Sequence, residues 1–176
     1  MTVQFVPNDY RIKHVTDHWE RRACIELRRA VFCDEQGLFD GSDVDAIDET
    51  AILIAAIACV AAIPERIIGT VRIHQSAPEV WYGSRLAVHP DFRSICSLGK
   101  ELIRHAVCTA HARGCQRFLA HVQQQNIKLF QHLHWTLLET ICVRDRPHGL
   151  MQADLACYPP RRENEIALVN AARAAA

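Results

Sequence analysis

The chain has 176 residues, enough for one domain with a sizeable core and too few for two ordinary domains and a linker. Hydrophobic residues make up 49% of the chain and charged residues 23%, which excludes the disordered and collagen-like classes. The 20 Lys and Arg side chains balance the 20 Asp and Glu side chains, so nothing in the overall charge recruits nucleic acid or an anionic membrane.

The longest apolar stretch runs from Ala51 to Ile63 and ends at Pro64, well short of the roughly 20 residues that span a bilayer. The first residues, Met1 to Pro7, do not form the basic and apolar leader of a secreted protein. We therefore expect a cytoplasmic protein with neither membrane nor nucleic acid among its partners.

Cysteine and histidine are numerous, with 8 and 10 residues, yet their spacing does not predict a metal site. No two cysteines lie three positions apart, so the chain lacks a C-x-x-C pair for zinc or redox chemistry. His132 and His134, two positions apart, would point to different faces of a helix, and no third ligand accompanies them. We expect no metal.

The first strong element in chain order is a helix that begins after Asp17. Asp17 precedes Glu20 by three positions, which is the spacing of a capping box. Apolar residues then recur at helical spacing, at positions 19, 23, 27, 30 and 31. The next segment, Asp34 to Glu49, holds seven acids and no basic residue and contains Gly37 and Gly41, so it predicts a loop.

A hairpin of two strands is predicted from residues 51–63 and 67–73, with a buried helix as the alternative for the first of them. Pro64 and the charged pair after it mark the turn. Residues 80–88 predict a further strand, which ends at His89-Pro90 because proline cannot donate a hydrogen bond to a sheet.

The clearest helix covers residues 97–113, where apolar residues lie four positions apart and Gly114 suits the end. After it we expect a strand, a short helix and two final strands, at residues 117–122, 125–133, 135–143 and 151–158. This order predicts an α/β sandwich around a mixed sheet. We expect a single domain over residues 1–176, with an Ala-rich tail from about residue 163.

Residues 85–93 carry the strongest signal for chemistry, because there a strand breaks at a proline and a short loop leads into the helix. The first N–H groups of a helix have no partner within the helix, and the helix dipole favours an anion there. With Arg93 nearby, the segment predicts a phosphate site. The alternative is an ordinary turn with a surface arginine.

Leu86-Ala87-Val88-His89-Pro90-x-x-Arg93, followed by Gly99 and Leu102-Ile103, resembles the fourth strand, cofactor loop and next helix of the GNAT superfamily of acyl-CoA-dependent N-acyltransferases. The resemblance implies an α+β sandwich with a mixed, twisted sheet of about six to seven strands flanked by helices. It implies acetyl-CoA or another acyl-CoA as co-substrate, with the backbone of Leu86, Ala87 and Val88 pairing with the pantetheine amide. The other implied cofactor-binding residues are Arg93, Ser94, Ser97, Leu98, Gly99, Lys100 and Phe130.

Three further segments are similar to the same superfamily. Residues 29–37, with Asp48-x-x-Ala51 after them, are similar to the opening of a GNAT branch that includes autoinducer-synthase-like members. Residues 68–72 resemble the third strand, and residues 129–135 the late helix and the strand after it. Together these segments span roughly residues 20 to 155.

Three positions depart from the family pattern. The loop from Arg93 to Gly99 is one residue longer than usual and has Ser97 in place of its first glycine, so it must take a different path. Phe130 stands where many members have a tyrosine that protonates the departing thiolate, and a phenyl ring has no proton to give. Tyr82 stands where several members have a glutamate base, and tyrosine is a poor base at neutral pH.

The candidate catalytic groups are Tyr82, His74 and Glu79. His74 ends a predicted strand and an imidazole suits a general base, while simple exposure at a strand end is the alternative. For Glu79 the alternative is a solvated charge at a strand edge. The acids at positions 40, 43, 45 and 48 would attract a cationic amine, or else form a solvated loop that caps the next element.

We expect an N-acyltransferase that moves an acetyl or longer acyl group from acyl-CoA to a small-molecule amine by direct attack. The alternative, supported by Phe130 and Tyr82, is a catalytically weakened acyl-CoA-binding or interaction module of the same fold. A Cys/His-rich redox or metal protein does not fit the ligand spacing. The sequence leaves a homodimer open.

Overall fold

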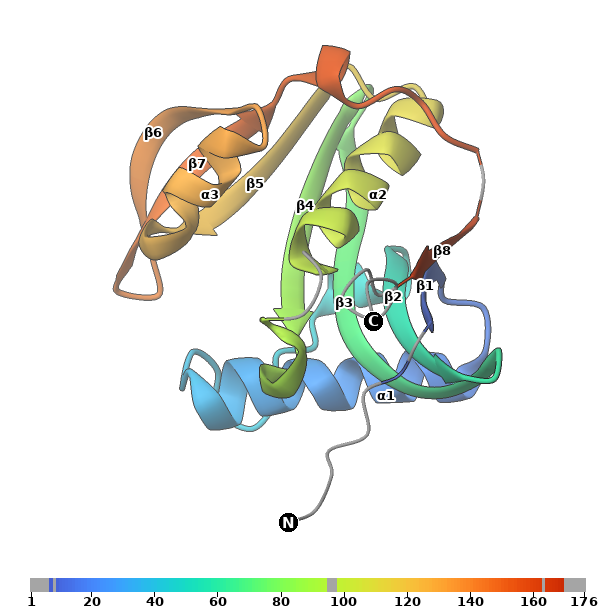
Figure 1. Cartoon of the computed structure of the whole chain (residues 1–176). Helices are drawn as coiled ribbons and strands as arrows, with labels where there is room; N and C mark the ends of the chain where they lie inside the picture. The colour runs from blue at the N-terminus through green and yellow to red at the C-terminus, as the bar shows by residue number, and fades with distance from the viewer. Residues whose placement is uncertain (1–6, 8, 95–97, 163, 170–176) are drawn as a thin grey trace.

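A computed structural model describes residues 7, 9–94, 98–162 and 164–169 (Figure 1). Within them the strands form one eight-stranded sheet in the order β6-β7-β5-β4-β3-β2-β1-β8. The strands are β1 (Asp9–His14), β2 (Ile52–Val60), β3 (Ile63–Ala77), β4 (Val80–Val88), β5 (Arg117–Gln123), β6 (Trp135–Val143), β7 (Arg146–Ala153) and β8 (Glu165–Val169). The α-helices are α1 (His18–Arg29), α2 (Leu98–Ala112) and α3 (Ile127–His132).

Shorter helical turns connect these elements. A π-helical turn, Ala30–Glu35, continues α1, and 3-10 turns cover Ala46–Glu49, Pro90–Phe92, Gln124–Asn126 and Leu155–Cys157. Part of the segment that we predicted as an acidic loop is therefore helical. The predicted capping box is present at the start of α1, where the Glu20 carboxylate accepts a hydrogen bond from the backbone N–H of Asp17 at 3.2 Å.

The mixed sheet flanked by helices is confirmed, but it has more strands than the six to seven expected. We did not predict the short strand β1, nor β8, which pairs antiparallel with β1 from Asp9 and Val169 inward. Residues 165–169 therefore belong to the sheet, although we assigned them to the Ala-rich tail. The bounds of the last predicted strand, residues 151–158, were also wrong, because β7 ends at Ala153. The Asp154 side chain then accepts a hydrogen bond from the Ala156 N–H and caps a 3-10 turn.

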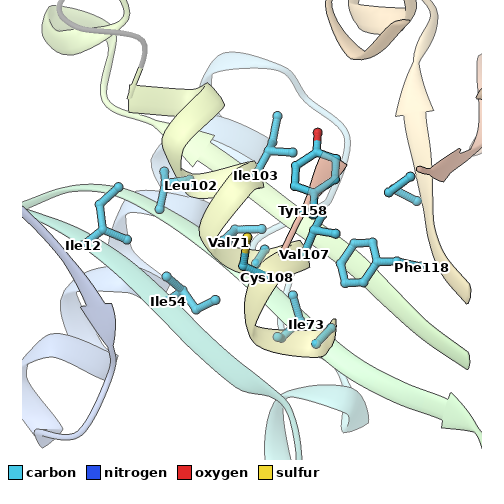
Figure 2. Packing of buried hydrophobic residues seen from close by; sticks show 14 of the residues in the cluster. Ile12, Ile54, Val71, Ile73, Leu102, Ile103, Val107, Cys108, Phe118 and Tyr158 are labelled. Carbon is cyan, nitrogen blue, oxygen red and sulfur yellow. The ribbon is translucent and has the colours of Figure 1, made fainter. Parts of the chain in front are cut away.

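The two faces of the sheet pack against different helices. Along β2, Ile54, Ala56 and Ala58 belong to the core under α2, while the residues between them belong to the core under α1. Figure 2 shows the first of these cores, where Leu102, Ile103 and Val107 of α2 lie over the strands. Both faces of β2 are therefore buried, and for this reason its sequence is a continuous run of apolar residues.

Gly69 of β3 packs closely against α2. A Cβ built at Gly69 would lie only 2.8 Å from Cδ1 of Leu102, so a larger residue there would require the buried Leu102 side chain to shift. The start of α2 also lies beside the end of β4, because a Cβ at Gly99 would be 3.9 Å from the Val88 side chain.

Strands β4 and β5 run parallel and pair only from Val80 and Arg117 to Gly83 and Ala120. Beyond that point the two strands separate, as Figure 1 shows. A bulge lies just past the separation, at Arg85, which has a φ of 54°. The bulge reverses the alternation of β4, so that Trp81 before it and Leu86 after it both pack toward the core under α2.

A buried histidine on α2 predicts a loss of stability in mild acid. His105 is 2% exposed, neither ring nitrogen has a hydrogen-bond partner in the described part of the chain, and burial lowers its pKa to about 4. In the unfolded chain a histidine titrates near 6.5, so the unfolded state gains a proton first as the pH falls. We expect full stability above pH 6.5 and a loss of up to about 3 kcal/mol toward pH 4.

Urea unfolding at pH 7 and pH 4.5 would measure this effect. His105→Leu should show a smaller difference between the two conditions than the wild type. His132→Leu, a substitution at an exposed histidine, should keep the wild-type difference. An unchanged pH dependence in His105→Leu would show that this imidazole does not govern it.

Candidate functional site

A cavity of about 550 Å³ lies where β4 and β5 separate. The part of its wall that belongs to the α2 core is apolar and includes Leu86, Ile103, Ala106, Phe118, Ala120, Val122, Phe130 and Trp135. The other part is polar and includes Asp45, Arg72, His74, Tyr82, Ser84, Arg85, His121, Gln123, Arg144 and His148. The cavity therefore joins an apolar surface to a polar one through the gap in the sheet.

Two of the three predicted catalytic residues lie together in this cavity. His74 of β3 pairs with Tyr82 of β4, and their rings stack with centroids 5.9 Å apart. On the other side of Tyr82, the ring of His121 of β5 lies 5.7 Å away. Burial, and then the charge of Arg72, lowers the pKa of His74, so its imidazole is neutral at pH 7.

The third predicted residue, Glu79, lies elsewhere. It is exposed in the turn between β3 and β4, and the cavity wall does not include it. Its backbone carbonyl accepts hydrogen bonds from the N–H groups of Gln116 and Arg117, and it has a φ of 62°. The structure therefore corrects the catalytic assignment of Glu79 and favours the alternative, a solvated charge.

Three arginines surround three of the acids that we expected to attract a cationic amine. Arg28 lies 2.7 Å from Asp43 and 2.6 Å from Asp48, joining α1 to the acidic segment. We call the six residues Arg28, Arg72, Arg85, Asp43, Asp45 and Asp48 the acid–arginine cluster. In the rest of the cluster, Arg72 binds Asp45 and Asp48 at 2.5 and 2.9 Å, and Arg85 binds Asp43 and Asp45 at 2.9 and 3.1 Å.

The acid–arginine cluster is neutral and mostly buried. Arg28 is 0% exposed and Asp43 is 1% exposed. Burial alone would raise the pKa of Asp48, but hydrogen bonds from Arg28 and from the Asp45 N–H outweigh it and lower that pKa. The acids therefore hold the segment against the sheet, and the hypothesis that they attract a cationic amine is not supported.

Arg93, which we expected to bind the pyrophosphate, is already paired. Its guanidinium makes two hydrogen bonds of 2.7 Å to the Glu35 carboxylate, and its Nε donates to the Val88 carbonyl at 3.0 Å. The hydrogen bonds from Arg93 lower the pKa of Glu35. In this arrangement Arg93 joins the end of β4 to the turn after α1 and does not offer a free guanidinium.

The remaining predicted cofactor residues follow β4 into α2. Ser94 and Lys100 are exposed, Gly99 is half-buried beside Val88, and the Leu98 side chain is buried in the core. Ser97 lies outside the described residues. Only the backbone of Leu98, not its side chain, is therefore suited to a ligand.

Phe130 lies in the cavity wall, on the apolar side. It belongs to α3 and packs edge-on against Trp135, with ring centroids 5.0 Å apart. The indole N–H of Trp135 donates to the hydroxyl of Tyr158 at 3.1 Å, which holds that ring in place. Phe130 is thus held in a fixed position, and its phenyl ring carries no hydroxyl group.

Three polar residues of the cavity wall were not predicted from the sequence: His121, Gln123 and His148. Phe118, Ala120 and Val122 alternate along β5 and pack in the core under α2, so His121 and Gln123 must point to the opposite face. That alternation is visible in the sequence and could have identified His121. His148 had no such signal, because we did not predict the strand in which it lies.

Two further kinds of feature are absent from the described residues. No group of three or more His, Cys, Asp or Glu side chains is placed to hold a metal ion there. No helix in the same part of the chain is both long enough and apolar enough to cross a membrane.

Comparisons with known proteins agree with this architecture. Residues 22–135 match the acetyltransferase (GNAT) family. An acyl-CoA N-acyltransferase from Pseudomonas aeruginosa is 18% identical with a TM-score of 0.65, over 82% of this chain and 99% of that one. A comparison with curated proteins finds no match.

Two synthases of acyl-homoserine lactone type also share the fold. The AHL synthase LasI is 15% identical with a TM-score of 0.66, over 90% of this chain and 99% of that one. The CoA-dependent synthase BjaI is 19% identical with a TM-score of 0.60, over 82% of this chain and 76% of that one. Since the family match covers more than half of the chain, the protein belongs to the GNAT acetyltransferase family.

Proposed function

We propose that this protein is an N-acyltransferase that moves an acetyl or longer acyl group from acyl-CoA to a small-molecule amine by direct attack. The observation that carries the proposal is the cavity between β4 and β5, which joins an apolar wall to a wall of imidazole and arginine side chains. The proposal includes the cytoplasmic location expected from the sequence.

The residues at the gap fit the pantetheine part of an acyl-CoA. Past Gly83 no pairing with β5 continues in the described residues, so β5 does not cover the edge of Leu86 to Val88, although the Val88 carbonyl accepts a hydrogen bond from Arg93. An extended amide chain can pair with such an edge as an added strand does. The N–H groups of the first turn of α2, which starts beside Val88, suit the pyrophosphate.

The polar wall suits an acceptor that has one amino group and no further positive charge. Among the described residues the wall has one carboxylate, that of Asp45, which is bound by Arg72 and Arg85 and so offers little to a polyamine. Arg144 adds another positive charge and lies 4.0 Å from the ring centre of Phe39. Burial lowers the pKa of both His74 and His121, so neutral imidazoles are available to take a proton from an ammonium group.

The apolar wall leaves room for an acyl chain longer than acetyl. One structure of this fold, that of BjaI, was solved with isopentyl-CoA and SAM, so the fold accommodates a branched acyl-CoA together with a second ligand. This supports a longer acyl group without choosing one for the present chain.

A thiol-release assay with a panel of acyl-CoA donors and primary amines tests the proposal. We expect release of CoA that depends on the amine, with monoamines favoured over polyamines. If acyl-CoA binds tightly but no amine produces thiol, the acyl-CoA-binding module of the same fold is the better assignment.

Phe130→Tyr should raise the rate of thiol release. The new hydroxyl would enter the cavity beside the apolar wall, where it could donate a proton to the departing thiolate. Such acid catalysis is worth about 10²- to 10⁴-fold with good geometry, and the gain here should be smaller because no neighbouring group orients the hydroxyl. Steady-state kinetics against Phe130→Leu, which adds no hydroxyl, would measure it, and equal rates in both variants would limit Phe130 to packing.

A further inference from the structure

The imidazole of His148 has a fixed orientation in the cavity wall. His148 is 7% exposed, and its Nδ1 lies 2.9 Å from the backbone carbonyl oxygen of Arg146. A carbonyl oxygen only accepts hydrogen bonds, so Nδ1 must carry the proton and donate it. In the neutral ring the lone pair is therefore on Nε2, which has no partner in the described part of the chain.

The sheet places this imidazole at the gap between the separated strands. His148 of β7 pairs with Gln123 of β5, which lies beyond Ala120, the last β5 residue that pairs with β4. Directly opposite residues in an antiparallel pair point to the same face of the sheet. His148 therefore lies on the same face as Gln123 and His121, which is the face opposite the core under α2. His148 and Leu86 of β4 both line this cavity.

The position of His74, the base expected from the sequence, suits a catalytic base less well than the position of His148. It pairs with Tyr82, which lies where β4 and β5 are still joined, and Nδ1 of His74 is buried with no hydrogen-bond partner among the described residues. No contact among the described residues fixes which nitrogen of His74 holds the proton, whereas the Arg146 carbonyl does so for His148.

We propose that His148 is the catalytic base and that its Nε2 takes a proton from the ammonium group of the acceptor. This assignment rests on the proposed function. His121, which is exposed and lies on the same face, passes the proton toward solvent, a step that water can replace.

The atoms balance in this step. The ammonium gives one proton to Nε2 and becomes a neutral amine, whose lone pair forms a C–N bond with the thioester carbon. The C–S bond then breaks and its electron pair leaves on sulfur. The second proton of the nitrogen goes to the thiolate, which gives the free thiol of CoA, and the proton on His148 returns to water.

Two substitutions and a pair of probe amines test the proposal. His148→Gln removes the base, and His148→Asn does the same while its amide N–H can still donate to the Arg146 carbonyl. Benzylamine is protonated at pH 7, whereas hydroxylamine is already neutral. We expect both variants to lose about 10²-fold or more with benzylamine and less than about 10-fold with hydroxylamine, because only the first acceptor needs the base.

A matched control is His111→Gln. Nδ1 of His111 also contacts a backbone carbonyl, that of Tyr158 at 2.6 Å, but His111 lies outside the cavity wall. This variant should keep the wild-type rate with both amines. Urea unfolding of each variant shows whether it is folded, and long-range ¹H–¹⁵N NMR of the wild type should show the Nδ1–H form of His148.

The outcomes separate this assignment from the proposed function. Equal losses with the two amines, an undiminished rate in folded His148→Asn, or an Nε2–H form of His148 would overturn the role of His148 alone. A wild type that releases no thiol with either amine would overturn the proposed function, and the role of His148 with it.

Discussion

We expect Arg28→Met to lower the free energy of unfolding by about 3–5 kcal/mol, the range for removing one partner of a buried ion pair. Arg28 is fully buried and contacts both Asp43 and Asp48. Without it these two carboxylates keep only their bonds to Arg72 and Arg85 and to the backbone, while methionine fills a similar volume.

Urea denaturation at pH 7 measures this loss. Arg29→Met is the matched control, because Arg29 is the next residue of the same helix and is exposed. The control should change the unfolding free energy by less than about 0.5 kcal/mol. Equal effects of the two substitutions would mean that the acid–arginine cluster contributes nothing particular to stability.

Ala120→Phe should reduce thiol release and acyl-CoA binding by at least about 10²-fold. Ala120 is the last residue of β5 that pairs with β4 and lies in the cavity wall, so a phenyl ring there would fill the gap. Overpacking a core position costs about 1–3 kcal/mol, which leaves a folded protein in which binding can be measured.

Titration calorimetry with acetyl-CoA checks this second prediction. Ala120→Ser, which adds a single oxygen atom, is the matched control and should bind acetyl-CoA nearly as the wild type does. An affinity in Ala120→Phe equal to that of the wild type, with the fold intact, would place the donor outside the gap.

The helices and the central strands could be predicted because their signals are local. The capping residues Asp17 and Glu20 and the four-residue spacing in α2 located both long helices, and β-branched residues and prolines located β2, β3 and β4. The edge strand β8 gave no such signal, because its pairing with β1 joins residues from the two ends of the chain.

The candidate site was predictable only in part, for a similar reason. The motif around Leu86 to Val88 lies in one segment and could be found from the sequence, and of its residues Leu86 lies in the cavity wall. The pairing of Arg93 with Glu35, and of Arg28 with Asp43 and Asp48, joins segments far apart in the sequence. Single charges in a sequence do not reveal their partners, so we assigned Arg93 to a phosphate and the acids to a cationic amine.

A crystal structure of the protein with a non-hydrolysable acyl-CoA thioether tests the central claim most directly. We expect the thioether between β4 and β5, the pantetheine beside the Leu86–Val88 edge, and the pyrophosphate at the first turn of α2. A ligand bound elsewhere on the protein, with nothing between the two strands, would contradict the assignment of this cavity to acyl transfer.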